Sequence, residues 1–220
     1  FRDSFIGSAK SRLGWLTSLF RDLPRQLSIP VLATSLSLIA ALGIGYYLAG
    51  RFVIPINNLK VDSLQDGVVQ GLEALPIYSV GGVFTVWLHN LRALMLATLL
   101  GIFSFGALGL LVIMLPLVII GYFMAALTGI GITPLMFLGA FVLPHGIVEI
   151  PAMIIAGAAI LRLGATLAAP APGKTIGAAF LDALASWTKV FFIVVAPMLL
   201  LAAVLEVYLT PTIVARFFGG

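Results

Sequence analysis

The sequence predicts an all-α fold, a polytopic transmembrane helical bundle of about five spans, and three observations support this prediction. Of the 220 residues, 61% are hydrophobic and only 9% are charged, whereas about a quarter of the residues are charged in soluble domains. Several apolar runs reach the roughly 20 residues that a helix needs to cross about 30 Å of hydrocarbon. The basic residues fall between these runs, where they act as topology signals. We therefore expect an integral membrane protein.

The composition also argues against several classes of function. A formal net charge of +4 could attract nucleic acid, but basic residues scattered between apolar spans are typical of membrane topology, and we expect no nucleic-acid partner. The chain has no cysteine, which excludes disulfides, thiolate metal sites and cysteine nucleophiles. It begins with Phe1 rather than methionine, so we expect the full-length protein to have its true start upstream.

The first 27 residues are expected to form an amphipathic helix on the cytoplasmic face. They mix five basic residues with aromatic and leucine side chains, a pattern typical of a helix that lies in the membrane interface. The rest of the chain, 28–220, is expected to be a single transmembrane domain. Its first span is 28–50, which has no charge before its end and finishes with the Tyr46–Tyr47 pair, and tyrosines favour the interface.

The middle of the chain is expected to cross the membrane twice. Segment 76–92 is short and interrupted, and it suits an interfacial or re-entrant helix that leads into the next span. The 35 apolar residues of 93–127 would form about 50 Å of helix, which is too long for one crossing. We therefore predict two spans, 91–107 and 109–127, with a tight turn near Phe105–Gly109, where glycines permit it.

Two further spans complete the prediction. The apolar segment 134–161 is too long for a straight crossing, at about 42 Å. We therefore expect the fourth span to be 144–162, and residues 134–143 to form a short re-entrant or interfacial piece. Residues 175–189 are predicted to form a surface helix, and residues 190–208 the last span.

The charges predict the orientation of the five spans. Eight basic residues then lie on the cytoplasmic side and four outside, in agreement with the positive-inside rule. A four-span chain conflicts with this rule, because Arg162, Lys174 and Lys189 would move outside. We expect the plasma membrane as location, a cytoplasmic N-terminus and an external C-terminus, with the last span closed by Thr210–Pro211.

The stretch LPHGIVEIPA in the fourth span places polar and helix-breaking residues where hydrocarbon is expected. Proline suits the first turn of a helix, where its missing N–H would lack a partner anyway. Pro144 is therefore expected to start this span, with Gly146 and Pro151 also shaping the helix. His145 and Glu149 are then four residues apart, on one helix face.

We predict a polar cluster around this face, near the outer membrane surface. Ionisable groups inside membranes usually pair with one another, because an isolated charge in hydrocarbon is costly. Arg92 or His145 would neutralise Glu149, with Asn90 forming a hydrogen bond nearby. The predicted cluster comprises His89, Asn90, Arg92, His145, Glu149 and Glu206.

Three roles remain open for this cluster. It can be a packing device that pins the second span to the fourth, or a proton or substrate path as in transporters. It can also be a metal site, because His and Glu at i, i+4 can ligate a metal and His89 could add a third ligand, which would imply an intramembrane hydrolase. The zincin motif HExxH is absent, and we expect no catalytic residue, no metal and no cofactor.

Glycines predict that the helices pack closely, since small residues let helix backbones approach one another. Gly157 and Gly164 belong to the fourth span, whereas Gly101, Gly106 and Gly109 surround the expected tight turn. We interpret this pattern as that of a packed bundle, and we expect homo-oligomers.

Three stretches of the chain form a recognisable set: HNLRALMLATLLGIFSFG, VLPHGIVEIPAMIIAGAAILRLG and LLLAAVLEVYLTP. The motif PHG-x-x-E-x-P-A in the second stretch is the most specific of them. Together they resemble the stage II sporulation protein M family, from about residue 85 onward.

The resemblance implies a multi-span helical membrane protein without enzymatic activity that assembles other membrane or cell-envelope proteins. In endospore formers the family member anchors and scaffolds cell-wall hydrolases during engulfment. Some relatives elsewhere are associated with ABC-transporter permeases, so a transporter or permease subunit is the alternative and an intramembrane hydrolase the third. Carried over by position, the characteristic residues are Asn90, Pro144, His145, Gly146, Glu149, Pro151 and Glu206.

Overall fold

The computed structural model describes residues 28–52, 77–170 and 172–218 of the chain. Within these ranges all regular structure is helical, and five helices are long and apolar enough to cross a membrane. The prediction of an all-α bundle with five long apolar helices is thereby confirmed. The expected amphipathic helix at 1–27 lies outside the described residues.

The helices follow one another along the chain in a simple order. They are an N-terminal helix Ser28–Ala49, α3 Val80–Phe103, α4 Ala107–Ala126, the 3₁₀-helix η1 Leu127–Ile130, α5 Pro134–Phe137, the π-helix η2 Leu138–Val142, α6 Leu143–Ala168, α7 Ile176–Val190, the π-helix η3 Phe191–Val195, α8 Ala196–Val204, the π-helix η4 Leu205–Leu209 and α9 Thr210–Phe218.

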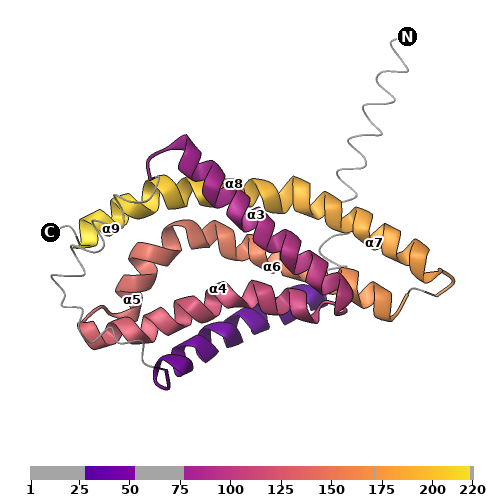
Figure 1. The fold of residues 1–220 in the computed structure, drawn as a ribbon, viewed down its shortest axis with the longest axis horizontal. Helices are drawn as coiled ribbons and strands as arrows, with labels where there is room; N and C mark the ends of the chain where they lie inside the picture. The colour runs from indigo at the N-terminus through magenta and orange to yellow at the C-terminus, as the bar shows by residue number, and fades with distance from the viewer. Residues whose placement is uncertain (1–27, 53–76, 171, 219–220) are drawn as a thin grey trace, which may run out of the picture.

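Helix α6 lies at the centre of the bundle. It packs against α3, α4, α7 and α8. In Figure 1 it lies between the long arch of α7 to α9 and the pair formed by α4 and the N-terminal helix, and α3 crosses in front of α8 and α6. Ile160 and Leu163 of α6 and Leu199 of α8 are each 1% exposed. The interior is therefore formed where these elements meet, and burial of such side chains stabilises the packing.

The tight turn between α3 and α4 lies where the sequence predicts it. Phe105 and Gly106 both have positive φ, 54° and 99°, a conformation that glycine adopts without steric cost. The N–H of Gly106 donates to the carbonyl of Gly101 at 2.7 Å. A Cβ atom on Gly164 of α6 would collide with the backbone of this turn, so the hairpin and α6 approach through glycine, as expected.

Helix α3 begins earlier than the predicted second span. It is one continuous helix from Val80, so segment 76–92 is not a separate piece for most of its length. The hydroxyl of Ser79 caps the helix by accepting a hydrogen bond from the N–H of Gly82 at 2.9 Å, which satisfies a donor that has no partner within the helix. Val83 packs against buried residues of the last helix, and this tertiary contact holds the first turns in helical form.

The fourth long helix is divided as expected near Pro144. This residue lies in the first turn of α6, and the preceding residues form α5 and the π-helix η2. The hydroxyl of Thr133 caps α5 by accepting from the N–H of Met136 at 3.2 Å. Figure 1 shows that α5 bends away from the direction of α6, so the 35-residue path Pro134–Ala168 is not one straight rod.

The last helix extends beyond the predicted span 190–208 at both ends. The expected surface helix 175–189 and the expected span 190–208 belong to one helical path, Ile176–Phe218, and Thr210–Pro211 does not end it. Because proline has no N–H, Pro211 leaves the carbonyl of Val207 without its usual partner one turn back. The N–H of Tyr78 donates to that carbonyl at 3.2 Å, so a segment before α3 replaces the missing hydrogen bond.

The helices run back and forth along the bundle. Figure 1 shows that the turn between α3 and α4, the end of α6 and the start of α7 lie at the end where the N-terminal helix begins, whereas η1 lies at the opposite end. This is the arrangement that five alternating crossings require.

Candidate functional site

Three side chains from two distant parts of the chain converge in the bundle. His145 and Glu149 come from α6, and Glu206 comes from the π-helix η4. One ligand atom of each, a ring nitrogen or a carboxylate oxygen, lies within 4.8 Å of the other two. We call these three residues the His-Glu-Glu cluster. All three are partly buried, so water only partly solvates their polar groups.

His145 and Glu149 lie one turn apart on the same face of α6, as their spacing predicts. The Nε2 atom of His145 is 3.7 Å from the Oε2 atom of Glu149. Their side chains are 17% and 21% exposed. This distance is too long for a hydrogen bond, although it allows electrostatic attraction if the imidazole is protonated.

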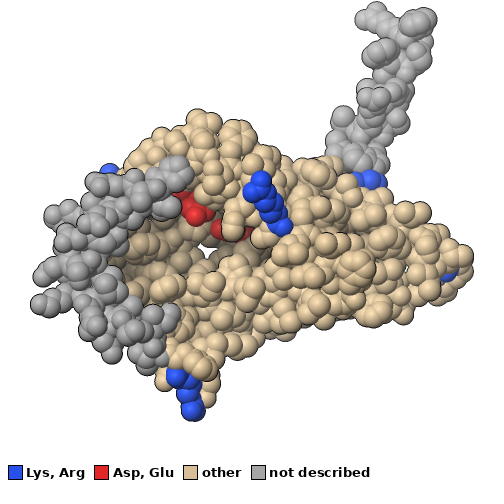
Figure 2. Space-filling model, viewed as in Figure 1, with Lys and Arg blue, Asp and Glu red and all other residues tan. Residues whose placement is uncertain are grey.

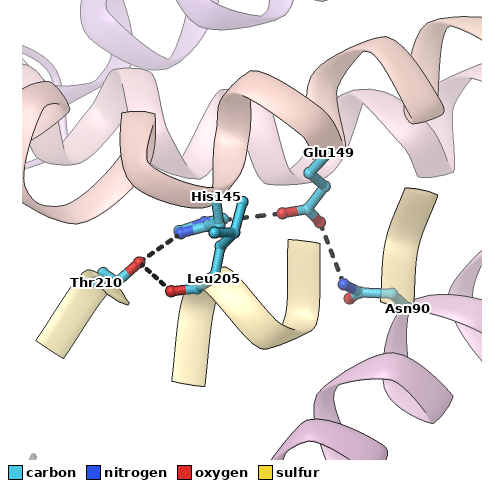
Figure 3. Close-up of polar contacts among 5 residues, drawn as sticks. All are labelled: Asn90, His145, Glu149, Leu205 and Thr210. Carbon is cyan, nitrogen blue, oxygen red and sulfur yellow. Dashed lines mark hydrogen bonds and ion pairs between the residues drawn. The ribbon is translucent and has the colours of Figure 1, made fainter. Parts of the chain in front are cut away.

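Asn90 approaches Glu149 from α3. Its Nδ2 atom donates to the Oε1 atom of Glu149 at 3.3 Å, and Figure 3 shows the amide and the carboxylate facing one another. The contact joins residues that are 59 positions apart. It orients one carboxylate oxygen toward α3 and the other toward His145.

Thr210 holds the other side of the His145 ring. The Nδ1 atom of His145 is 3.1 Å from the Oγ1 atom of Thr210, and that hydroxyl donates to the carbonyl of Leu205 at 3.3 Å, as drawn in Figure 3. The Leu205 carbonyl is five residues back, which matches the i, i+5 geometry of the π-helix η4. Sequence reasoning missed Thr210, because a threonine before a proline indicated only the end of a helix.

Glu149 also lines a small pocket of about 50 Å³ between α3, α4, α6 and α8. A volume of this order holds an ion or one or two water molecules. Figure 2 shows acidic surface inside a hollow on this face of the molecule. The pocket is lined by Asn90, Ala93, Leu94, Val112, Ile113, Pro116, Glu149, Met153 and Leu199.

Two predicted members of the cluster, His89 and Arg92, are exposed on α3. Successive residues of an α-helix are about 100° apart around its axis, so Arg92 lies about 200° from Asn90 and on the other side of α3. Within the described residues, no ion pair joins Arg92 to Glu149. His89 lies near enough to Glu206 to act on it electrostatically, but it is outside the His-Glu-Glu cluster.

The residues expected to shape α6 occupy distinct environments. Pro144 and Gly146 are buried at its start, where a Cβ atom on Gly146 would be 3.4 Å from the Val142 side chain. Pro151 lies inside the helix and is exposed. Because proline has no N–H, Pro151 leaves the carbonyl of Ile147 without its usual helical partner, in the turn between His145 and Glu149.

The arrangement limits the chemistry that these residues can perform. One imidazole and two carboxylates can bind a cation or pass a proton, because all three groups change protonation state or donate lone pairs. The same contacts also fasten α3, α6 and the last helix to one another. Packing, proton transfer and cation binding are therefore all compatible with the geometry.

Comparison with known proteins assigns the family. No curated protein and no solved structure matches the chain. The family model described as Stage II sporulation protein M matches residues 34–211, which include the His-Glu-Glu cluster together with Asn90 and Thr210. Most of this membrane-helical chain is thus accounted for by a single family, and the resemblance seen in its motifs is confirmed: the chain belongs to the stage II sporulation protein M family.

Proposed function

We propose that this protein is a membrane-embedded scaffold that assembles partner proteins at the bilayer. The observation that carries the proposal is the family match over residues 34–211. In a spore-forming host the partners would be cell-wall hydrolases, as the family resemblance implies, and in other hosts they would be membrane or cell-envelope proteins. The chain itself would perform no chemistry.

The polar contacts support a structural role for the cluster in such a scaffold. Asn90 on α3, His145 and Glu149 on α6, and Thr210 on α9 are joined by contacts of 3.1–3.7 Å. Inside a membrane, polar contacts of this kind hold helices together where apolar packing alone gives little specificity. The cluster would fix the relative positions of three helices and so preserve the surface that partners bind.

The outer surface of the bundle is suited to lipid or to partner helices. Leucine, isoleucine and phenylalanine side chains are exposed along α3 and α4, and an apolar surface of this extent is stable only in hydrocarbon or against another protein. Exposed examples are Leu96, Leu99, Phe103, Leu111, Leu115 and Ile119.

Affinity purification from the native host tests the scaffold. The full chain is isolated in mild detergent, and the proteins that remain bound are identified by mass spectrometry for wild type, Glu149→Gln and the control Asp182→Asn. Asp182 is 66% exposed and pairs with Lys174, so its substitution removes the same charge away from the cluster.

We expect envelope proteins, such as peptidoglycan hydrolases, to be recovered with wild type and with the control, and fewer of them with Glu149→Gln. Equal recovery from all three would contradict the role of the cluster, and absence of any envelope partner would contradict the scaffold.

A transporter or permease subunit is the second candidate. The observation that favours it is the pocket beside Glu149, because ionisable residues that face a cavity within a membrane mark ion and proton pathways. The same purification distinguishes the two candidates. A nucleotide-binding ATPase that co-purifies in fixed proportion would favour the transporter, whereas envelope proteins without an ATPase favour the scaffold.

A further inference from the structure

We propose that His145, Glu149 and Glu206 bind one divalent transition-metal cation of the zinc type. The proposal goes beyond the scaffold and does not depend on it. Its geometric basis is the convergence of three ligand atoms from α6 and η4 within 4.8 Å of one another.

The contacts of Thr210 fix the tautomer of His145. The hydroxyl proton of Thr210 is donated to the carbonyl of Leu205, so the oxygen of that hydroxyl can only accept from the imidazole. The Nδ1 atom of a neutral His145, 3.1 Å away, must then carry the ring proton. This leaves a lone pair on Nε2, and Nε2 is the atom that faces Glu149.

The lone pair of His145 Nε2 therefore faces the same space as the carboxylate oxygens of Glu149 and Glu206. Asn90 occupies the Oε1 atom of Glu149, and the Oε2 atom points toward Nε2 of His145 at 3.7 Å. Glu206 adds a second carboxylate to the same space. Like charges repel strongly where water is scarce, and a cation bound by all three groups removes the repulsion.

The chemistry of the three ligands selects the type of cation. Imidazole nitrogen suits zinc, copper, iron and nickel, whereas magnesium and calcium prefer oxygen ligands alone. Zinc binds one nitrogen and two carboxylate oxygens at about 2.0–2.2 Å. Ligand atoms on one zinc are then about 3.5 Å apart, and small side-chain rotations bring the present separations to that value.

The neighbours of the cluster resemble the second shell of a metal site. A histidine that ligates a metal through one ring nitrogen usually donates the other N–H to an oxygen, which fixes the orientation of the ring. Thr210 supplies that oxygen. Asn90 orients Glu149 in the same way, through a hydrogen bond to the carboxylate oxygen that does not face His145.

The metal would connect the fourth long helix to the last. Its ligands belong to α6 and η4, and a zinc ion with three protein ligands keeps a fourth position for water. In the absence of a cation, the same groups would share protons instead, and the experiment must separate these two states.

Metal binding to the purified full chain tests the proposal. The protein is isolated in detergent through a tag without histidines, treated with a chelator and dialysed. Zn²⁺ binding is then measured by calorimetry and by elemental analysis, with Mg²⁺ for comparison. We expect one Zn²⁺ per chain for wild type and for the control Asp182→Asn, no stoichiometric Zn²⁺ for Glu206→Gln, and no Mg²⁺. Thr210→Val, which removes a second-shell partner, is expected to weaken Zn²⁺ binding by about 10- to 100-fold.

Two results would overturn the metal site. One is the same Zn²⁺ stoichiometry and affinity in wild type and in a folded Glu206→Gln variant, and the other is a folded wild type that binds no Zn²⁺, which would leave shared protons as the state of the cluster. If Glu206→Gln does not fold, the absorption spectrum of wild type with Co²⁺ decides. Bands of a low-symmetry nitrogen and oxygen site support the proposal, and the spectrum of hydrated Co²⁺ refutes it. Because no partner is present, this outcome is independent of the scaffold.

Discussion

Thr34 shows how a single polar atom affects the packing of this bundle. Its side chain is 0% exposed, and its hydroxyl has no hydrogen-bond partner among the residues that the structure describes. The side chain lies against Gly157 of α6, where an added Cβ atom would be 2.6 Å from the methyl carbon of Thr34 and 3.3 Å from its hydroxyl oxygen. A buried hydroxyl without a partner costs about 1–3 kcal/mol.

We therefore expect Thr34→Val to stabilise the protein. Valine has nearly the same shape as threonine, so the substitution removes the unpaired hydroxyl without opening a cavity. The free energy of unfolding should rise by about 1 kcal/mol or more, which thermal unfolding in detergent would detect as a higher Tm.

Thr98→Val is the matched control for this change. Thr98 is also buried in a helix, but its hydroxyl donates to the carbonyl of Leu94 at 2.8 Å. Its replacement should leave the Tm unchanged or lower it. A Tm that rises equally in both variants would show that apolarity alone, and not the unpaired Thr34 hydroxyl, is responsible.

At the residue scale, spacing and charge identified part of the candidate site. The i, i+4 spacing placed His145 and Glu149 on one helix face, and the position of Glu206 at the outer end of the predicted last span put it at the same level of the membrane. Thr210 could not be predicted, because its contact with His145 depends on a π turn that has no clear sequence signal. Arg92 was one of two residues expected to neutralise Glu149, but it lies about 200° from Asn90 around α3, and packing turns Asn90 and not Arg92 toward the carboxylate.

Two glycines determine how closely the N-terminal helix and α4 pack. A Cβ atom on Gly45 would overlap the carbonyl of Val118, and a Cβ atom on Gly121 would overlap the carbonyl of Leu42. The backbones of the two helices are therefore in direct contact at this crossing. Such an approach is typical of helices that associate within membranes through small residues.

Gly45→Ala should destabilise the bundle by separating these helices. Overpacking of this kind typically costs about 1–3 kcal/mol, which would lower the Tm in detergent. Gly43→Ala is the control two residues away, because nothing lies within 4 Å of a Cβ atom there. It should have no effect or stabilise the helix by up to about 1 kcal/mol. Equal Tm values for the two variants would contradict the close crossing.

At the element scale, apolar length predicted that helices exist but not where the last one ends. Proline is a reasonable stop signal, yet α9 continues through Pro211 to Phe218. The reason is tertiary: Tyr78 supplies the hydrogen bond that Pro211 cannot. Apolar length likewise did not predict where α3 begins, because its start at Val80 depends on contacts with the last helix.

The whole molecule has an orientation that can be tested with reporters. With five crossings and a cytoplasmic start, the connection 169–175 should lie in the cytoplasm and the C-terminus outside. A reporter fused after Pro172 should show cytoplasmic activity, and one fused after Gly220 should show external activity. A reporter in segment 53–76 is the control and should be external. External activity after Pro172 would contradict the predicted topology.

At the scale of the whole molecule, composition and the length of the apolar runs predicted the features that the structure confirms. Membrane character and the five long apolar helices followed from apolar run length, because hydrocarbon thickness imposes it on any chain. The central position of α6 did not follow, since it depends on which helices pack together. Such packing is specified by small residues and polar contacts that are too frequent in apolar helices to be assigned in advance.

The origin of the His-Glu-Glu cluster has a consequence for biogenesis. His145 and Glu149 belong to α6, but Glu206 and Thr210 belong to a helical path that the ribosome makes later. During translation the first two residues therefore enter the bilayer before their partners exist. Until Thr210 has been made, His145 lacks the hydroxyl that holds its ring, and until Glu206 has been made the third member of the cluster is missing. The cluster can therefore assemble only after the fifth long helix has joined the others, which makes its formation a late step of membrane insertion.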